Sequence, residues 1–180
     1  CSSLLKAQIN AITETGDEVT LYDNGTWQYV NDSLNIEIEI PTSDEVYMKD
    51  IKSTFLVKSL KLDVGVWINP KEWSFSKGTG DDASEFEFQK KGEDLYGMMI
   101  TEKLEIPIPT LKGIALQNAR SVSPDIKVTK EEYRKVNGIN VLMMQMSGTI
   151  QGMRFIYYGY YYSSEKGTVQ FLAYTGESLL

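Results

Sequence analysis

The sequence contains no histidine, so it lacks the residue most often used as a general base and as an imidazole metal ligand. Its single cysteine, Cys1, has no partner for a disulfide within the chain. Positive charge is also scarce, because 18 lysines and arginines face 25 aspartates and glutamates and leave a net charge of −7. Since a basic surface supplies most of the affinity for nucleic acid, we do not expect a nucleic-acid partner.

Long apolar runs are missing as well. The longest stretches, such as 139–146, fall far short of the roughly 20 residues that a membrane-spanning helix needs. A chain of 180 residues suits one domain with a small appendage, and it can bury a core without a disulfide or a metal. With so few basic residues, membrane residence would have to come from an anchor.

Cys1 stands where a start methionine would be expected, and Ser2 and Ser3 follow it. The processing that leaves a cysteine first is bacterial lipoprotein maturation, in which the thiol receives a diacylglyceryl group. We therefore expect Cys1 to be a lipid-attachment site, and the protein to be a membrane-anchored envelope lipoprotein that faces the periplasm or the exterior. A chain start introduced by cloning is the alternative.

Residues 1–45 predict a small first unit. Three stretches of alternating polarity, 7–13, 18–23 and 26–30, are separated by turn signals, the second of which is Asn24-Gly25. They predict a three-stranded β-meander, which is marginal alone and should pack Trp27 and Leu21 against the rest of the protein or another copy. Residues 31–45 are polar and acidic, and we expect a linker with one edge-strand-like stretch at 36–40.

Residues 46–180 predict a larger second unit that is rich in strands. Residues 60–67 alternate in polarity, and 85–88 should form a strand with both phenylalanines facing inward. The Asn137-Gly138 turn predicts a hairpin. One helix is expected, with Thr110 as its N-cap, one apolar face from Leu111 to Val122, and Pro124 just beyond its end.

The strand at 153–162 is aromatic on both faces. Tyr157 and Tyr161 point one way, whereas Tyr158, Tyr160 and Tyr162 point the other way. Both faces of the sheet should therefore be covered. The helix can cover one face, and the other face needs the meander, a second helix beyond Leu180, or a partner chain.

Four segments in this order, "GVWINPKEW", "PIPTLKGIALQNARS", "KVNGINVLMMQMSG" and "MRFIYYGYYYSSEKGTVQFLAYT", resemble the PsbP-like family over about 46–175. The resemblance implies an α+β fold, in which helices flank both faces of an antiparallel sheet to form an α/β/α sandwich. It also implies binding or scaffolding rather than catalysis, and it provides no catalytic residue. The family pattern places a helix after about Thr175, where this sequence has only 176–180.

The candidates for chemistry are weak on residue type alone. Asp81, Asp82 and Glu85 could form a calcium loop, but a solvated acidic loop is the better interpretation. Glu131 and Glu132 are neighbours on a strand, so their carboxylates should point to opposite faces. The serines have no histidine to activate them. We therefore expect no enzyme, no metal site and no cofactor.

The function expected from these features is a protein-binding or scaffolding module, with a protein partner or a homodimer. Trp27, Tyr158, Tyr160 and Tyr162 are the candidate interface or ligand-binding residues, because tyrosine and tryptophan are common in interfaces. For the tyrosines, packing in the core or on the sheet face is the preferred interpretation. The alternative is a carrier of a small apolar ligand or lipid. Its pocket would lie between sheet and helix and be lined by Met144, Met146 and Leu116, for which plain core packing is the competing interpretation.

Overall fold

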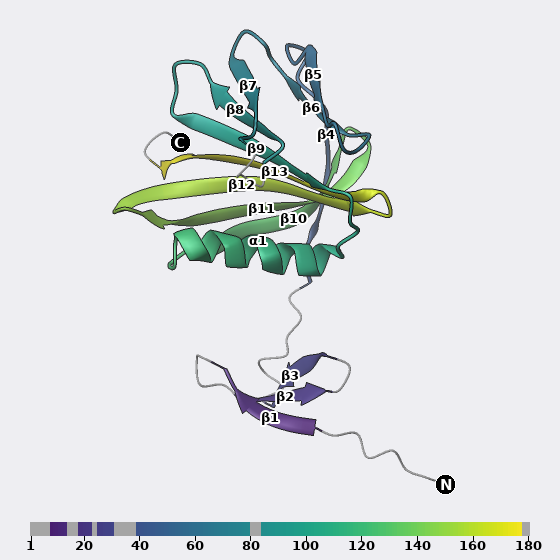
Figure 1. The fold of residues 1–180 in the computed structure, drawn as a ribbon, viewed down its shortest axis with the longest axis vertical. Coiled ribbons are helices and arrows are strands. Elements are labelled where there is room, and N and C mark those ends of the chain that lie inside the picture. Colours follow the sequence, from purple (N-terminus) through teal and green to yellow (C-terminus); the bar gives the residue numbers. More distant parts are fainter. Residues whose placement is uncertain (1–7, 14–17, 23–24, 31–38, 80–83, 178–180) are drawn as a thin grey trace. The chain divides into compact units, whose positions relative to one another are not determined.

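The structure, a computed structural model, describes residues 8–13, 18–22, 25–30, 39–79 and 84–177. The chain divides into two compact units, Cys1–Glu39 and Ile40–Leu180 (Figure 1). The division lies earlier than the boundary expected after residue 45. The reason is that strand β4 (Thr42–Tyr47), which spans that expected boundary, pairs with the main sheet of the second unit.

The first unit contains one three-stranded antiparallel sheet in the order β1-β2-β3. Its strands are β1 (Gln8–Ile12), β2 (Glu18–Tyr22) and β3 (Trp27–Tyr29). The cross-strand row Ile9–Leu21–Trp27 lies on one face, and it is followed by the row Ala11–Val19–Tyr29 on the same face. The opposite face carries the polar row Asn10–Thr20–Gln28, so the sheet is amphipathic.

The second unit is built on an eight-stranded sheet in the order β4-β10-β11-β12-β13-β9-β8-β7. Its other strands are β10 (Lys127–Val136), β11 (Ile139–Ile150), β12 (Met153–Ser164), β13 (Gly167–Gly176), β9 (Leu95–Glu102), β8 (Phe86–Lys90) and β7 (Trp73–Lys77). All neighbouring strands are antiparallel except β4, which runs parallel to β10. The sheet is therefore mixed rather than purely antiparallel.

Two tight turns shape the long central hairpins. Asn137 and Gly138 have positive φ values of 48° and 86°, as a type I′ turn requires, which confirms the hairpin predicted at this dipeptide. Gln151 and Gly152 repeat the arrangement with φ values of 51° and 81°. This second turn connects the end of β11 at Ile150 to the start of β12 at Met153.

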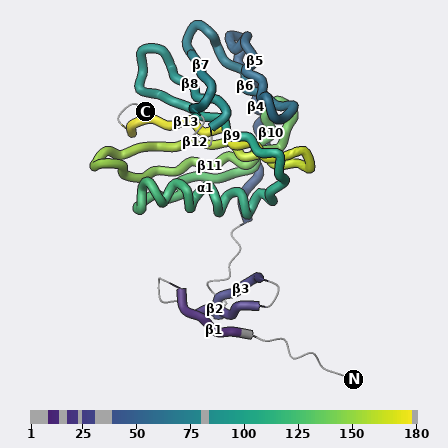
Figure 2. The backbone as a smooth tube through the Cα atoms, in the orientation of Figure 1, coloured from purple at the N-terminus to yellow at the C-terminus, as the bar shows by residue number. Residues whose placement is uncertain are grey.

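Helix α1 (Ile108–Val122) covers one face of the sheet (Figure 2). Leu111 and Ala115 are buried against Leu142, Met144 and Tyr161 of β11 and β12. The helix begins earlier than expected, because Pro107 is its N-cap and Pro109 fits in the first turn, where no N–H donor is needed. Ile114 and Val122 are exposed, so the buried stripe is narrower than the sequence pattern indicated.

The prediction of an α/β/α sandwich was wrong. The described residues are mostly β, with α1 as the one α-helix among them. The face opposite α1 is partly covered by a hairpin of β5 (Phe55–Lys58) and β6 (Gly65–Ile68). Its Val57 and Ile68 pack on Phe86, Phe88 and Met99. The apolar residues of β5 and β6 recur at strand spacing, so this segment covers the sheet as a hairpin and not as a helix.

Glu85 fastens the β5–β6 hairpin to the sheet. The Ser59 hydroxyl donates a hydrogen bond of 2.7 Å to its carboxylate, and the Thr101 hydroxyl and the Leu60 N–H also donate to it. Partial burial alone would raise the pKa of Glu85, but these hydrogen bonds lower it below its ordinary value. Glu85 is therefore an ionised structural clamp. The other two members of the expected acidic loop, Asp81 and Asp82, lie outside the described residues.

Candidate functional site

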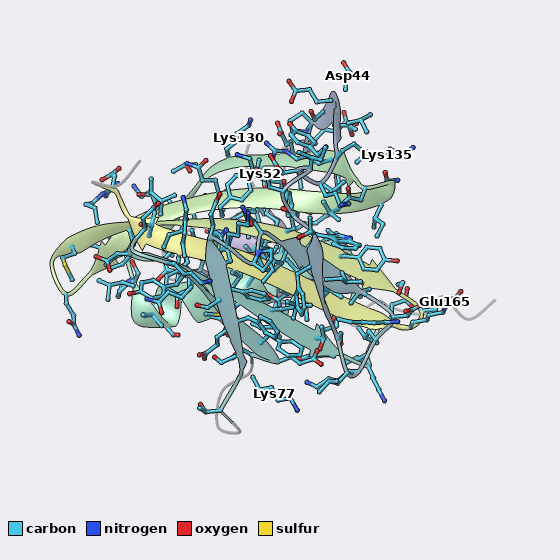
Figure 3. The ribbon with its side chains drawn as sticks, turned by 90° about the horizontal axis from the view of Figure 1, so that it is seen from above. Asp44, Lys52, Lys77, Lys130, Lys135 and Glu165 are labelled. Atoms are coloured by element: carbon cyan, nitrogen blue, oxygen red, sulfur yellow. The ribbon has the colours of Figure 1, made fainter. Side chains whose placement is uncertain are left out.

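An open hollow of about 510 Å³ lies between the β5–β6 hairpin and the sheet face opposite α1. Figure 3 views the second unit from above, with Lys52 labelled in the upper half of the view. Five aromatic rings line the hollow: Tyr47, Trp67, Tyr160, Tyr162 and Phe171. They come from β4, β6, β12 and β13, so the hollow exists only once the hairpin is folded onto the sheet.

A second hollow of about 440 Å³ adjoins the first and shares part of its lining, including Trp67 and Phe171. It adds the apolar side chains of Trp73, Phe88 and Leu95. We call the two hollows together the aromatic groove. Their volumes lie in the range of sites that hold small organic molecules. Their lining is mainly aromatic and aliphatic, and it includes the charged side chains of Lys49, Asp50, Lys52 and Glu72.

Lys49 and Trp67 stand together in the groove. The Lys49 ammonium lies 4.5 Å from the centroid of the Trp67 ring, within the range of a cation–π contact. The Lys49 backbone N–H donates to Asn137 Oδ1 at 2.8 Å, and the Asn137 N–H donates to the Tyr47 carbonyl at 2.8 Å. The β10–β11 turn therefore holds the end of β4 in place beside the groove.

Arg134 lies behind the tyrosines of the groove and is only 7% exposed. Its guanidinium donates to Glu132 at 2.6 Å, to Tyr160 at 3.3 Å and to Tyr158. Its charged end also lies 4.3 Å from the centroid of the Tyr47 ring. One buried cation thus connects β4, β10 and β12, and it orients the Tyr160 ring that lines the groove.

The charges of this network follow from its hydrogen bonds. The hydrogen bond from Arg134 lowers the pKa of Glu132 below its ordinary value, so Glu132 is ionised at neutral pH. Burial would lower the pKa of Arg134, but its bonds to Tyr160 and Glu132 raise it further above neutrality. Burial raises the pKa of Tyr158, which keeps that phenol protonated. Glu132, Arg134 and Tyr158 therefore keep these protonation states at neutral pH, and they support the groove from a fixed position.

The structure separates the residues predicted from the sequence. Tyr160 and Tyr162 line the aromatic groove, and Tyr158 lies beside it on Arg134. Met144 and Met146 are buried in the core beneath α1, packed with Tyr161. The space where the sequence placed a lipid pocket, between the sheet and α1, is therefore filled by the chain's own side chains among the described residues.

Sequence reasoning missed Trp67, Lys49, Tyr47 and Arg134. Trp67 appeared only as the end of an alternating segment, because its role depends on where the β5–β6 hairpin lies. Arg134 appeared as a neighbour of the two glutamates. The sequence held one signal for this network. Arg134 lies in one predicted strand, and tyrosines spaced two residues apart lie in another.

Trp27 lies in the first unit, on the apolar face of the three-stranded sheet. It is 51% exposed and packs edge-to-face on Tyr29, with ring centroids 5.1 Å apart. Ile9 and Leu21, in the same cross-strand row, are also exposed. Cys1 lies outside the described residues.

The carboxylates have structural partners. Glu131 pairs with Lys112 of α1 at 2.6 Å, whereas Glu132 faces Arg134 on the other side of the sheet, as expected for strand neighbours. Asp125, just beyond α1, accepts hydrogen bonds from Thr149 and Ser123, which lower its pKa to about 2. In the described part of the chain, no three acidic or cysteine residues cluster as a metal site would require. No helix among these residues is long and apolar enough to cross a membrane.

The sequence matches no family profile and no curated protein. Solved structures with a similar fold include the following two. PA94, a Pseudomonas aeruginosa protein of unknown function, is 11% identical with a TM-score of 0.41, over 69% of this chain and 83% of that one. Cyanobacterial PsbP (CyanoP) from Synechocystis sp. PCC 6803 is 15% identical with a TM-score of 0.44, over 61% and 72%.

CyanoP belongs to the PsbP-like family that the sequence resembles. TM-scores of this size mark a partial likeness of fold.

Proposed function

We propose that the protein is a non-enzymatic binding protein whose second unit holds a small, largely apolar molecule in the aromatic groove. The observation that carries this proposal is the open hollow of about 510 Å³ lined by the rings of Tyr47, Trp67, Tyr160, Tyr162 and Phe171. Five rings around a hollow of this size present a large apolar area with little conformational freedom to lose on binding.

The titratable groups support binding rather than catalysis. Glu85, Asp125 and Glu132 all have lowered pKa values, so they are ionised and hydrogen-bonded at neutral pH. A general acid or base needs a pKa near the working pH, which is the opposite direction of shift. None of the three lines the aromatic groove.

A neutral fluorescent apolar probe, N-phenyl-1-naphthylamine, tests the proposal on the full chain. We expect saturable binding at one site, and we expect Trp67→Ala to weaken it about tenfold, because an exposed ring that a ligand covers is removed. The measurement is a fluorescence titration. Trp27→Ala is the matched control, since it removes the same side chain from the other unit and should leave the dissociation constant unchanged. Binding that is non-saturable, or that is unaffected by Trp67→Ala, would contradict the proposal.

A second candidate function, protein binding by the first unit, is favoured by the exposed row Ile9–Leu21–Trp27 on the apolar face of its sheet. We propose that two copies of this face pack together, because a three-stranded sheet with an open apolar face is marginal alone. Trp27→Ser should then lower the dimer fraction in sedimentation velocity, whereas Gln28→Ser on the polar face should not. A chain that stays monomeric at every concentration would contradict this proposal.

The lipid anchor on Cys1 and the envelope location stay proposals beside these two. The mass of the intact protein isolated from its native cells tests them. Addition of a diacylglyceryl group and a further acyl chain is the expected result, because two or more chains are needed for stable attachment. A free thiol at Cys1 would contradict both.

A further inference from the structure

The aromatic groove carries hydrogen-bond donors with protons to spare, and the carboxylates of Asp50 and Glu72 also belong to its lining. Asn137 Oδ1 accepts the Lys49 N–H at 2.8 Å, which leaves its amide N–H groups. Asp50 Oδ1 accepts the Lys52 N–H at 2.7 Å. The Tyr160 oxygen accepts from Arg134 at 3.3 Å, which leaves the phenol proton to be donated.

Arg134 also strengthens Tyr160 as a donor. A cation that donates to a hydroxyl oxygen polarises the O–H bond of that hydroxyl, so its proton forms a stronger hydrogen bond to the next acceptor. The arginine is fixed by Glu132 at 2.6 Å and is nearly buried, so this polarisation is permanent at neutral pH. An acceptor oxygen that reaches Tyr160 from the groove would meet a pre-oriented donor.

Lys49 adds positive charge to the same hollow. Its ammonium donates one hydrogen bond, of 3.3 Å, to the Ser53 carbonyl and lies over the Trp67 ring. Among the described residues, no carboxylate forms an ion pair with it. A cation beside apolar rings, with protons to spare, is complemented by an anionic oxygen on a bound molecule.

The second hollow extends the groove away from Lys49 and Tyr160. It continues from Trp67 and Phe171 toward the apolar side chains of Trp73, Phe88 and Leu95, and Lys52, Asn69 and Glu72 also line it. A molecule that placed a polar end near Lys49 and Tyr160 could therefore extend an apolar chain along the rest of the groove.

We infer that the groove binds an amphiphile with one apolar chain and a terminal carboxylate, the chemistry of a free fatty acid. Lys49 and Tyr160 hold the carboxylate, and the rings of Trp67 and Phe171 contact the chain. This inference rests on the proposed apolar-ligand function and adds the chemical class of the ligand. It assigns Lys49 to charge recognition and Arg134 to positioning Tyr160.

Oleate, oleyl alcohol and methyl oleate, each below its aggregation concentration, test the inference with the full chain at pH 7.5. They share one apolar chain and differ in the end group, so their affinity ratios isolate the carboxylate. Displacement of the neutral fluorescent probe gives each dissociation constant. We expect oleate to bind about tenfold more tightly than the alcohol or the ester, as a hydrogen bond to a charged group provides.

Two variants assign the selectivity to its residues. Lys49→Met keeps an apolar side chain of similar length, so it should remove most of the preference for oleate and leave the affinity for oleyl alcohol unchanged. Tyr160→Phe should reduce the preference about threefold or more, since it removes one donor. Lys103→Met is the matched control, because Lys103 is exposed and lines neither hollow. A thermal melt of each variant checks that it is folded.

The outcomes separate this inference from the function on which it rests. Equal binding of oleate and oleyl alcohol by the unmodified protein would overturn the carboxylate assignment and leave the apolar groove intact. An oleate preference that survives Lys49→Met would overturn the role of Lys49. Failure of all three compounds and of the neutral probe to bind would overturn the proposed function itself.

Discussion

Leu111→Ala should lower the free energy of unfolding by about 2–5 kcal/mol, which is the usual cost of truncating a buried leucine. Leu111 is 1% exposed and, like Ala115, belongs to the buried cluster that α1 forms with Leu142, Met144 and Tyr161 of the sheet. The truncation leaves a cavity that these side chains cannot close, because they are held on paired strands. Urea denaturation followed by circular dichroism measures the loss.

Val122→Ala is the matched control for Leu111→Ala. Val122 lies in the same helix but is 61% exposed, so its truncation removes little buried surface. We expect a change of less than about 0.5 kcal/mol for the control. Similar effects for the two variants would mean that α1 does not pack on the sheet through the face that carries Leu111.

Local signals were enough to predict much of the second unit. The Asn137-Gly138 turn requires positive φ at both residues, and the structure has it. Phe86 and Phe88 alternate with polar residues and are buried, as predicted. Leu142 and Met144 share a core face for the same reason. Each of these inferences needs only the side-chain period of a strand and the conformational preferences of a few residues.

The covering of the second sheet face could not be predicted in the same way. The alternation at 60–67 predicted a single stretch, whereas the structure has β5 and β6 on either side of the turn at 59–64. The place of this hairpin over the sheet depends on Glu85 bonding to Ser59, 26 residues away in the chain. No local pattern encodes that contact. The resemblance to a helix-flanked family therefore led to an α/β/α sandwich, and the groove beneath the hairpin was missed with it.

The tyrosines and methionines show that residue type alone cannot tell a groove residue from a core residue. Tyr160 and Tyr162 were candidate interface or ligand-binding residues because tyrosine is common in interfaces, and both line the groove. Met144 and Met146 were offered by the same kind of reasoning, and both are in the core. The difference lies in which face α1 covers, and that depends on the register of β11 against β12.

Arg134→Met should lower the free energy of unfolding by about 3 kcal/mol, because removing one member of a buried ion pair leaves the other uncompensated. Glu132 would keep only Lys130, at 3.3 Å, and the hydroxyls of Tyr158 and Tyr160 would lose their donor. The methionine fills much of the space of the arginine stem, so lost packing contributes little. Chemical denaturation at neutral pH measures the change.

The double variant Glu132→Gln/Arg134→Met separates the ion pair from the rest of the network. It removes the Glu132 carboxylate, which Arg134→Met leaves without its main partner. The double variant should therefore be more stable than Arg134→Met alone, with an interaction energy of about 1 kcal/mol or more. Additive effects of the two substitutions would contradict a coupled pair.

The pH dependence of the free energy of unfolding tests the Glu132–Arg134 pair independently. The folded pKa of Glu132 lies below its ordinary value of 4.5, so its contribution to stability is complete above that pH and is lost as pH falls through the folded pKa. Arg134→Met removes the main cause of the lowered pKa, and the variant should therefore lose less stability than the unmodified protein between pH 5 and about pH 3. Parallel pH profiles for the two proteins would show that Arg134 does not hold Glu132 in its ionised form, and that the polarisation of Tyr160 needs another source.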